Sequence, residues 1–162
     1  MTANDVRDRQ SDRRPVSVGV MNADRFNLQR FVDAQNDVYE EVLVELAHGR
    51  KTTHWMWFVF PQLRALGRSV TAHYYGIASA EEAVTYLRHP LLGARLRQCV
   101  DLLLTLNMSN PHGIFGSPDD LKLRSCLTLF DAVAPDESRF KEALDRFYPD
   151  GPDGETLGLL TE

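Results

Sequence analysis

Apolar side chains recur at spacings of three and four along most of this 162-residue chain, and that spacing predicts helices. The clearest stripe lies between Leu91 and about Asn107, where one side carries Leu92, Leu96, Cys99, Leu103 and Leu106. The segment Asn27–His48 has the same pattern and predicts one long helix, capped by Asp24 or Asn27. No strand with a partner is indicated. The sequence therefore predicts an all-α fold, an irregular single-domain bundle of about six or seven helices.

Capping signals set the expected bounds of the shorter helices. Ser69 opens one through Tyr75, and the capping box Ser79-Ala80-Glu81-Glu82 opens one that ends near Arg88. The run Ser117-Pro118-Asp119-Asp120 is a strong helix start, and its two acids are explained by the helix dipole. Residues 107–116 predict a loop, and Ser138–Tyr148 a further helix.

The two ends of the chain lack a periodic apolar face. Residues 1–21 alternate charged and small polar side chains, which predicts a disordered N-terminal tail. Residues 151–162 are rich in glycine, proline and aspartate, and predict a loosely held C-terminal tail. The all-α domain is therefore expected over residues 22–150.

Composition excludes several classes of function. The net charge of −5 and the isoelectric point of about 5.5 argue against duplex nucleic acid as a partner. No apolar run reaches the roughly 18 residues of a membrane span, and the N-terminus lacks the apolar region of a signal peptide. We therefore expect no membrane partner and a cytoplasmic protein. Cys99 and Cys126 fit free, buried thiols there, with a disulfide or a reactive thiol as the alternative.

Common catalytic signatures are absent from the sequence. There is no glycine-rich phosphate loop, zinc-protease motif, cysteine pair at zinc spacing or esterase elbow. His48 and His54 are six residues apart, and the other histidines are isolated. We accordingly predict no metal site and no cofactor.

Gly49–Gln62 is the most aromatic segment and contains both tryptophans. Residues 54–60 read as a two-turn helix with Thr53 as its cap and Pro61 after its end, although locally a strand fits as well. One interpretation makes this segment part of the core, with His54 a satisfied core histidine. The other makes it the wall of a pocket, in which aromatic faces stack on a planar ligand and basic groups contact an anion.

The pocket interpretation selects polar and aromatic side chains that border apolar stripes. The candidate catalytic residues are His54, Lys51 and Lys122. The candidate ligand-binding residues are Gln35, Tyr39, Arg50, Trp55, Trp57, Gln62 and Ser125. Gln35 lies within an apolar stripe, so its amide must either bond to the backbone or line a cavity.

Longer motifs carry a family resemblance. The first is Phe31-x-x-Ala34-Gln35 followed by Tyr39, and the second is Gly49-Arg50-Lys51-x-x-His54-Trp55-Met56-Trp57-Phe58-x-Phe60-Pro61-Gln62. Further matches are Tyr86-Leu87-x-His89-Pro90-Leu91-Leu92-Gly93 and Asp120-x-Lys122-x-x-Ser125-x-x-Thr128-Leu129-Phe130. Over roughly residues 24–160 the chain resembles domain-of-unknown-function family 1810 (DUF1810), a bacterial family. That resemblance implies an all-α fold and no established activity.

Two other labels bear on function. Some members of that family are called calpastatin-like, but nothing in this chain resembles a disordered protease inhibitor. The C-terminal half is faintly similar to the NADAR family of N-glycosidases, through a His-Pro-x-x-Gly helix and a later Lys/Thr-Leu-Phe helix. That similarity implies a ligand such as ADP-ribose or a riboflavin-precursor N-glycoside.

Two functions of different classes follow. The leading hypothesis is a pocket for a small nucleotide-like or ADP-ribose-like ligand, with hydrolysis of an N-glycosidic bond as its reaction. The alternative is a non-catalytic protein-interaction module in which the aromatic segment is core, with a partner that the sequence does not identify.

Overall fold

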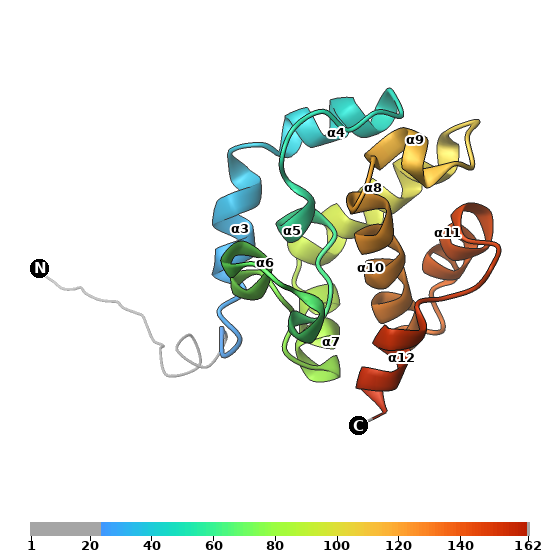
Figure 1. The fold of residues 1–162 in the computed structure, drawn as a ribbon. Coiled ribbons are helices and arrows are strands. Elements are labelled where there is room, and N and C mark those ends of the chain that lie inside the picture. The colour runs from blue at the N-terminus through green and yellow to red at the C-terminus, as the bar shows by residue number, and fades with distance from the viewer. Residues whose placement is uncertain (1–23, 162) are drawn as a thin grey trace, which may run out of the picture. The chain divides into compact units, whose positions relative to one another are not determined.

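The computed structural model describes residues 24–161, and every regular element in that range is helical (Figure 1). The range contains ten α-helices and one 3₁₀-helix: α3 (Gln29–Asn36), α4 (Tyr39–Ala47), α5 (Met56–Val59), η1 (Arg64–Leu66), α6 (Val70–Tyr74), α7 (Ala80–Arg88), α8 (Leu92–Thr105), α9 (Pro111–Phe115), α10 (Asp119–Val133), α11 (Ser138–Phe147) and α12 (Gly154–Leu160). The predicted all-α class is confirmed, but the expected six or seven helices were too few. The expected N-terminal tail, residues 1–21, lies outside the described residues.

Residues 24–30 contain the segment that leads into α3 and the first two residues of that helix. The carboxylate of Asp24 accepts hydrogen bonds from the backbone N–H groups of Leu28 and Gln29, the latter at 3.2 Å. Asn27, the other expected cap, has a positive φ of 55° just before the helix begins. Asp24 therefore caps α3.

The single long helix predicted for Asn27–His48 is wrong, because α3 ends at Asn36 and α4 begins at Tyr39. Val38, between them, has φ −129° and ψ −2°, outside the helical region. Asn36 and Asp37 precede this break, and both residue types compete with helical hydrogen bonding through their own side chains. The apolar spacing is continuous across the break, so periodicity alone gave no sign of it.

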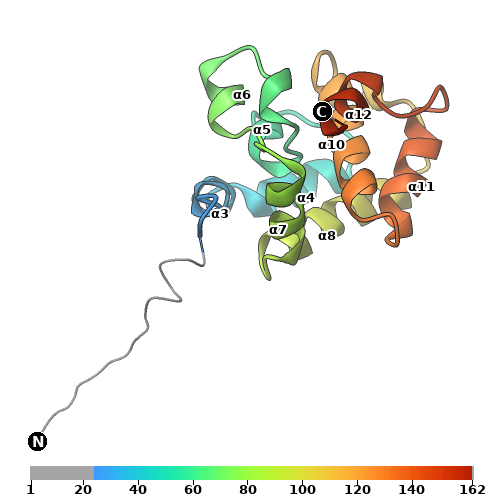
Figure 2. The same ribbon diagram turned by 90° about the horizontal axis from the view of Figure 1, so that it is seen from below.

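The core of residues 31–161 is built around α8 and α10. Helix α8 packs against α4, α7 and α11, and α10 packs against α7, α9, α11 and α12. Figure 2 shows α11 and α12 beside α10. Cys99 and Cys126 are free and buried, as predicted. Burial raises the pKa of Cys99 to about 12, so this thiol is protonated and unreactive at neutral pH.

The connection from α7 to α8 depends on His89 and Gly93. The imidazole Nδ1 of His89 accepts from the backbone N–H groups of Leu91 and Leu92, both at 3.1 Å, and so caps the start of α8. A Cβ atom added to Gly93 would lie 2.1 Å from the carbonyl oxygen of Leu87. The close approach of two backbones therefore requires glycine at this position.

The C-terminal residues, which we expected to be a loosely held tail, contain helix α12. Asp153 caps this helix by accepting from the backbone N–H of Thr156 at 3.0 Å. Thr156 is fully buried, and α12 packs against α10. One capping carboxylate and a buried threonine anchor the segment, although it lacks a large apolar face. Residues 107–116, expected to be a loop, likewise contain the short helix α9.

The aromatic segment is less helical than predicted, since α5 covers Met56–Val59 and not residues 54–60. Thr53 does not cap it, because the Thr53 hydroxyl donates to the Glu45 carboxylate at 2.6 Å. The same carboxylate accepts from the N–H groups of Thr52 (2.8 Å) and Thr53 (3.2 Å), and from Nε1 of Trp55 (2.9 Å). Glu45 therefore holds the residues before α5 in a non-helical conformation.

Glu45 is a buried carboxylate that remains ionised. Burial by itself raises its pKa, but the four hydrogen bonds from Thr52, Thr53 and Trp55 outweigh that effect and lower the pKa to about 2. The folded state thus binds a proton at Glu45 less readily than the unfolded chain does. The resulting stability is complete above the unfolded pKa of about 4.3 and is lost as the pH falls through the folded value.

We predict that Glu45→Gln lowers the free energy of unfolding at pH 7 by about 1–3 kcal/mol, because charge-assisted hydrogen bonds are lost. The difference from the wild type should shrink as the pH falls from about 5 towards 2. Urea denaturation at several pH values measures both effects. The control is Glu41→Gln, which changes an exposed carboxylate on the same helix. A difference that is constant across this pH range would contradict the role of the ionised carboxylate.

Candidate functional site

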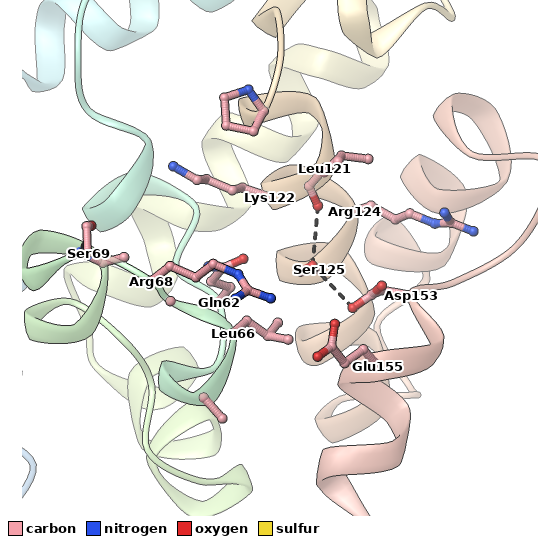
Figure 3. Close-up of a pocket in the computed structure, with 14 residues that line it drawn as sticks. Gln62, Leu66, Arg68, Ser69, Leu121, Lys122, Arg124, Ser125, Asp153 and Glu155 are labelled. Carbon is pink, nitrogen blue, oxygen red and sulfur yellow. Dashed lines mark hydrogen bonds between the residues drawn. The ribbon is translucent and has the colours of Figure 1, made fainter.

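A cleft of about 540 Å³ lies between the segment around η1 and α6 and the helices α10 and α12 (Figure 3). Its polar lining consists of Gln62, Arg68, Ser69, Lys122, Arg124, Ser125, Asp153 and Glu155. Leu66, Ala72 and Leu121 add apolar surface. The cleft therefore combines charged groups of both signs with an apolar lining.

One wall is a closed loop, residues 62–77. An isolated parallel bridge joins Leu63 and Ile77, with Ile77 N–H donating to Gln62 O at 2.9 Å and Arg64 N–H donating to Ile77 O at 2.8 Å. Within the loop, the hydroxyl of Ser69 accepts from Ala72 N–H at 3.0 Å and caps α6, as predicted. Between the two ends of the loop, residues 65–69 and Ala72 line the cleft.

Arg68 is the most accessible cation of this wall. It is exposed and forms no hydrogen bond or ion pair within residues 24–161. Figure 3 shows its side chain reaching from the loop into the space between the walls. The side-chain amide of Gln62, also without a partner in the described part of the chain, lies beside it. Both groups have unused hydrogen-bond donors at the cleft.

On the opposite wall, α10 supplies Lys122. Its ammonium lies 3.5 Å from Oδ1 of Asp119 and 5.1 Å from the centre of the Trp57 ring. Oδ2 of Asp119 lies 2.9 Å from the ammonium of Lys51. Asp119 thus joins two of the three predicted catalytic residues, a role beyond the expected helix-dipole effect.

Lys51 pairs with Asp119 inside the protein and does not line the cleft. Its side chain is only 7% exposed, and its ammonium donates to Thr53 O at 2.6 Å. The ammonium also lies 5.0 Å from the centre of the Trp55 ring. Lys51 therefore ties the aromatic segment to the start of α10.

Asp153 forms the acidic side of the cleft together with Glu155. Its Oδ2 atom accepts from Ser125 Oγ at 3.3 Å, from Thr156 N–H at 3.0 Å and from Thr156 Oγ1 at 2.5 Å. Its own N–H donates to Thr128 Oγ1 at 2.9 Å. The Oδ1 atom forms no hydrogen bond in the described range. The carboxylate is thus held in one orientation with a free acceptor.

Arg124 of α10 forms no ion pair with either Asp153 or Glu155. Glu155 is exposed and has no ion pair among the described residues. Arg124 donates through Nε to Gly151 O at 2.9 Å, and Figure 3 shows its guanidinium turned away from the cleft. Within residues 24–161 the two carboxyl groups therefore have no ion-pair partner, and they lie opposite the loop that carries Arg68.

Three of the ten predicted site residues line the cleft: Gln62, Lys122 and Ser125. Trp57 is next to it and, with Gln62 and Lys122, lines an adjoining cavity of about 10 Å³. Trp55 is buried, and its Nε1 is bound by Glu45. Trp55 is therefore a core residue, as the core interpretation of the aromatic segment expects.

Gln35 and Tyr39 have structural partners away from the cleft. The Gln35 amide donates to Phe58 O at 2.6 Å and to the Tyr86 hydroxyl at 3.2 Å, and its oxygen accepts from Arg95 at 3.3 Å. The Tyr39 hydroxyl donates to Oε1 of Gln98 at 2.7 Å. Burial raises the pKa of Tyr39, so its hydroxyl stays protonated.

His54 and Arg50 are exposed and do not line the cleft. The interpretation of His54 as a satisfied core histidine is wrong for this reason. Glu45 holds the residues before α5 in a non-helical conformation, in which the His54 side chain is exposed while Trp55 enters the core. The sequence had suggested that His54 and Lys51 share one pocket, which the structure does not support.

Sequence reasoning missed Arg68, Asp153 and Glu155. Arg68 is a single cation between Gly67 and Ser69 and carries no distinctive pattern. The spacing Asp153-x-x-Thr156 is a capping signal that was available, but the glycine and proline content of residues 149–154 masked it.

Within residues 24–161, no helix has the length and apolar content needed to cross a bilayer. The same residues contain no group of three or more histidine, cysteine or acidic side chains arranged to hold a metal ion.

Comparisons with known proteins identify relatives without an assigned activity. The family described as "Protein of unknown function (DUF1810)" matches residues 25–160. The crystal structure of the conserved hypothetical protein Rv1873 from Mycobacterium tuberculosis is similar, with 50% sequence identity and a TM-score of 0.84. The match covers 86% of this chain and 99% of that chain. No curated protein matches the sequence.

We predict that Asp119→Asn lowers the free energy of unfolding by about 1–3 kcal/mol, because the buried ammonium of Lys51 loses its anionic partner. Asp120→Asn is the matched control, since Asp120 occupies the same helical turn and its ion-pair partner, His112, is 65% exposed. That change should cost less than about 1 kcal/mol. Chemical denaturation measures both variants, and equal losses would contradict a special role for Asp119.

Proposed function

Because the chain belongs to the DUF1810 family, whose description states no activity, we propose a function from the cleft itself: it binds a small anionic, nucleotide-like ligand. The observation that carries this proposal is Arg68, an exposed guanidinium without a partner in the described residues that reaches into the cleft. A guanidinium presents several donors in a fork that matches phosphate and carboxylate groups.

The rest of the lining supports an anionic end of the ligand near Arg68. Lys122 places a second cationic group, an ammonium, on the opposite wall, where Asp119 and the Trp57 ring hold it. The amide of Gln62 adds neutral donors. An anion between Arg68 and Lys122 would therefore meet charged donors from two sides, as phosphate sites in proteins do.

Size and apolar lining suit a ligand larger than a bare phosphate. Small-molecule sites typically have volumes of about 300–1,000 Å³, and this cleft has about 540 Å³. Leu66 and Leu121 offer apolar surface for a planar ring. This surface replaces Trp55, which is enclosed in the core, as the expected contact for a base.

Hydrolysis of an N-glycosidic bond is the reaction that we propose for such a ligand. Glu155 would accept a proton from a water molecule, and the water oxygen would bond to the anomeric carbon. The carbon–nitrogen bond would break, its electron pair staying on the nitrogen, which takes up a proton from solvent. The carboxylate of Asp153 would stabilise the positive charge that develops on the sugar.

The alternative of a protein-interaction module is favoured by one feature, the outer surface of α6. Val70 is 88% exposed and Tyr74 is 54% exposed, which is unusual for two apolar side chains on one short helix. A surface of this kind would bind a partner without needing the cleft. Ligand binding by the isolated protein therefore distinguishes the two functions.

We predict that ADP-ribose, NAD, a nucleotide or a riboflavin precursor raises the melting temperature of the wild type. At about 100 times the dissociation constant the shift should be about 5–10 °C. Arg68→Ala and Lys122→Ala should each weaken binding by about 10-fold to 100-fold, because a charged hydrogen bond to the anion is lost. Thermal-shift titrations measure these effects.

Arg50→Ala and His54→Ala are matched controls for that experiment, since both side chains are exposed and do not line the cleft. These two variants should bind as the wild type does. If none of the compounds shifts the wild type, the proposed pocket is rejected and the interaction module takes its place.

For the reaction, we predict that Glu155→Gln lowers kcat about 100-fold or more with little change in binding, because a general base is removed. Chromatographic detection of the released base from NAD and from riboflavin-precursor N-glycosides measures the rate. Turnover that is unaffected by Glu155→Gln would reject this residue as the base, while binding without any turnover would leave a ligand-binding protein.

A further inference from the structure

We propose that the acidic side of the cleft recognises the vicinal hydroxyl groups of a ribose, so that the ligand is a ribose phosphate and not a deoxyribose phosphate. This inference rests on the proposed function, because it assumes that the anionic group of the ligand lies near Arg68 and Lys122. It adds the substrate class and assigns a selectivity role to Asp153.

Asp153 is a preorganised acceptor. Three donors, from Ser125 and Thr156, hold its Oδ2 atom, while Oδ1 is left without a hydrogen bond in the described range. A hydrogen bond from Asp153 N–H to Thr128 Oγ1 also fixes the backbone of Asp153. A carboxylate that is already oriented loses little conformational freedom when a ligand binds to it.

The position of Asp153 relative to the cations suits a sugar phosphate. Figure 3 shows Glu155 on α12 and Asp153 just before this helix, with Ser125 of α10 beside them, across the cleft from the loop that carries Arg68. A ligand with its phosphate near Arg68 would extend its sugar towards these carboxylates. Carboxylates that accept from ribose hydroxyls are a common device in nucleotide sites.

Charge favours hydroxyl groups over an ammonium group as the donors. Carboxylates accept from both, but Arg68 and Lys122 line the same cleft and would repel an ammonium ion. Neutral hydroxyl groups meet no such repulsion. The mixed charge of the cleft therefore matches a molecule that is anionic at one end and polyhydroxylated at the other.

The test compares AMP with 2′-deoxy-AMP, which differ by one hydroxyl group, together with inorganic phosphate and phosphoethanolamine. In calorimetric titrations the wild type should bind AMP about 10-fold more tightly than 2′-deoxy-AMP, the effect expected of one hydrogen bond to a charged group. Phosphoethanolamine, which carries an ammonium in place of the hydroxyls, should bind no more tightly than phosphate.

Asp153→Asn is the decisive variant, because asparagine caps a helix about as well as aspartate and should leave α12 folded. We expect the preference for AMP to fall from about 10-fold to about 3-fold, since charge-assisted hydrogen bonds are about twice as strong as neutral ones. Phosphate should bind this variant at least as tightly as the wild type, because one negative charge is removed from the cleft. Glu142→Gln, which alters an exposed carboxylate of α11, is the control and should keep the full preference.

The outcomes separate this inference from the function on which it rests. Equal binding of AMP and 2′-deoxy-AMP by the wild type overturns the ribose inference and leaves anion binding intact. A full preference that survives Asp153→Asn, or tighter binding of phosphoethanolamine than of AMP, also overturns it. If neither nucleotides nor phosphate bind, the proposed function fails as well.

Discussion

The hydrogen bonds to the Glu45 carboxylate determine how the aromatic segment enters the fold. Four donors from Thr52, Thr53 and Trp55 converge on this one buried anion. They keep the residues before α5 from continuing the helix, direct the Trp55 ring into the core and leave His54 in solvent. Because no cation is among the partners of this carboxylate within residues 24–161, its ionised form depends on those donors, and the conformation of the segment depends on its ionisation.

The position of the cleft follows from this arrangement through two ion pairs. Lys51, next to the residues that Glu45 binds, contacts Asp119 at the first position of α10, and Asp119 in turn contacts Lys122. The aromatic segment is thereby attached to the helix that forms one wall of the cleft. The loop closed by Leu63 and Ile77 supplies the other wall. Arg68 and Asp153 then face a common space although they lie 85 positions apart in the sequence.

This geometry shifts the functional interpretation from an aromatic pocket to a cleft of mixed charge. The relatives share the fold but carry descriptions without an activity, so the chemistry has to come from the cleft itself. Arg68 and Lys122 suit an anion, whereas Asp153 and Glu155 suit hydroxyl donors or a developing positive charge. The tryptophans, which dominated the sequence pattern, mainly stabilise the core and the lysines that lie over their rings.

Local patterns in the sequence determined the helical class, the caps Ser69 and Ser79 and the buried thiols, because these depend on neighbours within a few positions. The break between α3 and α4 and the shortened α5 depend on partners from distant segments, which periodicity does not report. The residues of the candidate site were even harder to predict from the sequence. Lys51 and His54 are three residues apart, yet one is buried and the other exposed, and Asp153 joined the cleft from a presumed tail. Only tertiary packing decided which polar side chains share one cleft, because long-range ion pairs and hydrogen bonds set their orientation.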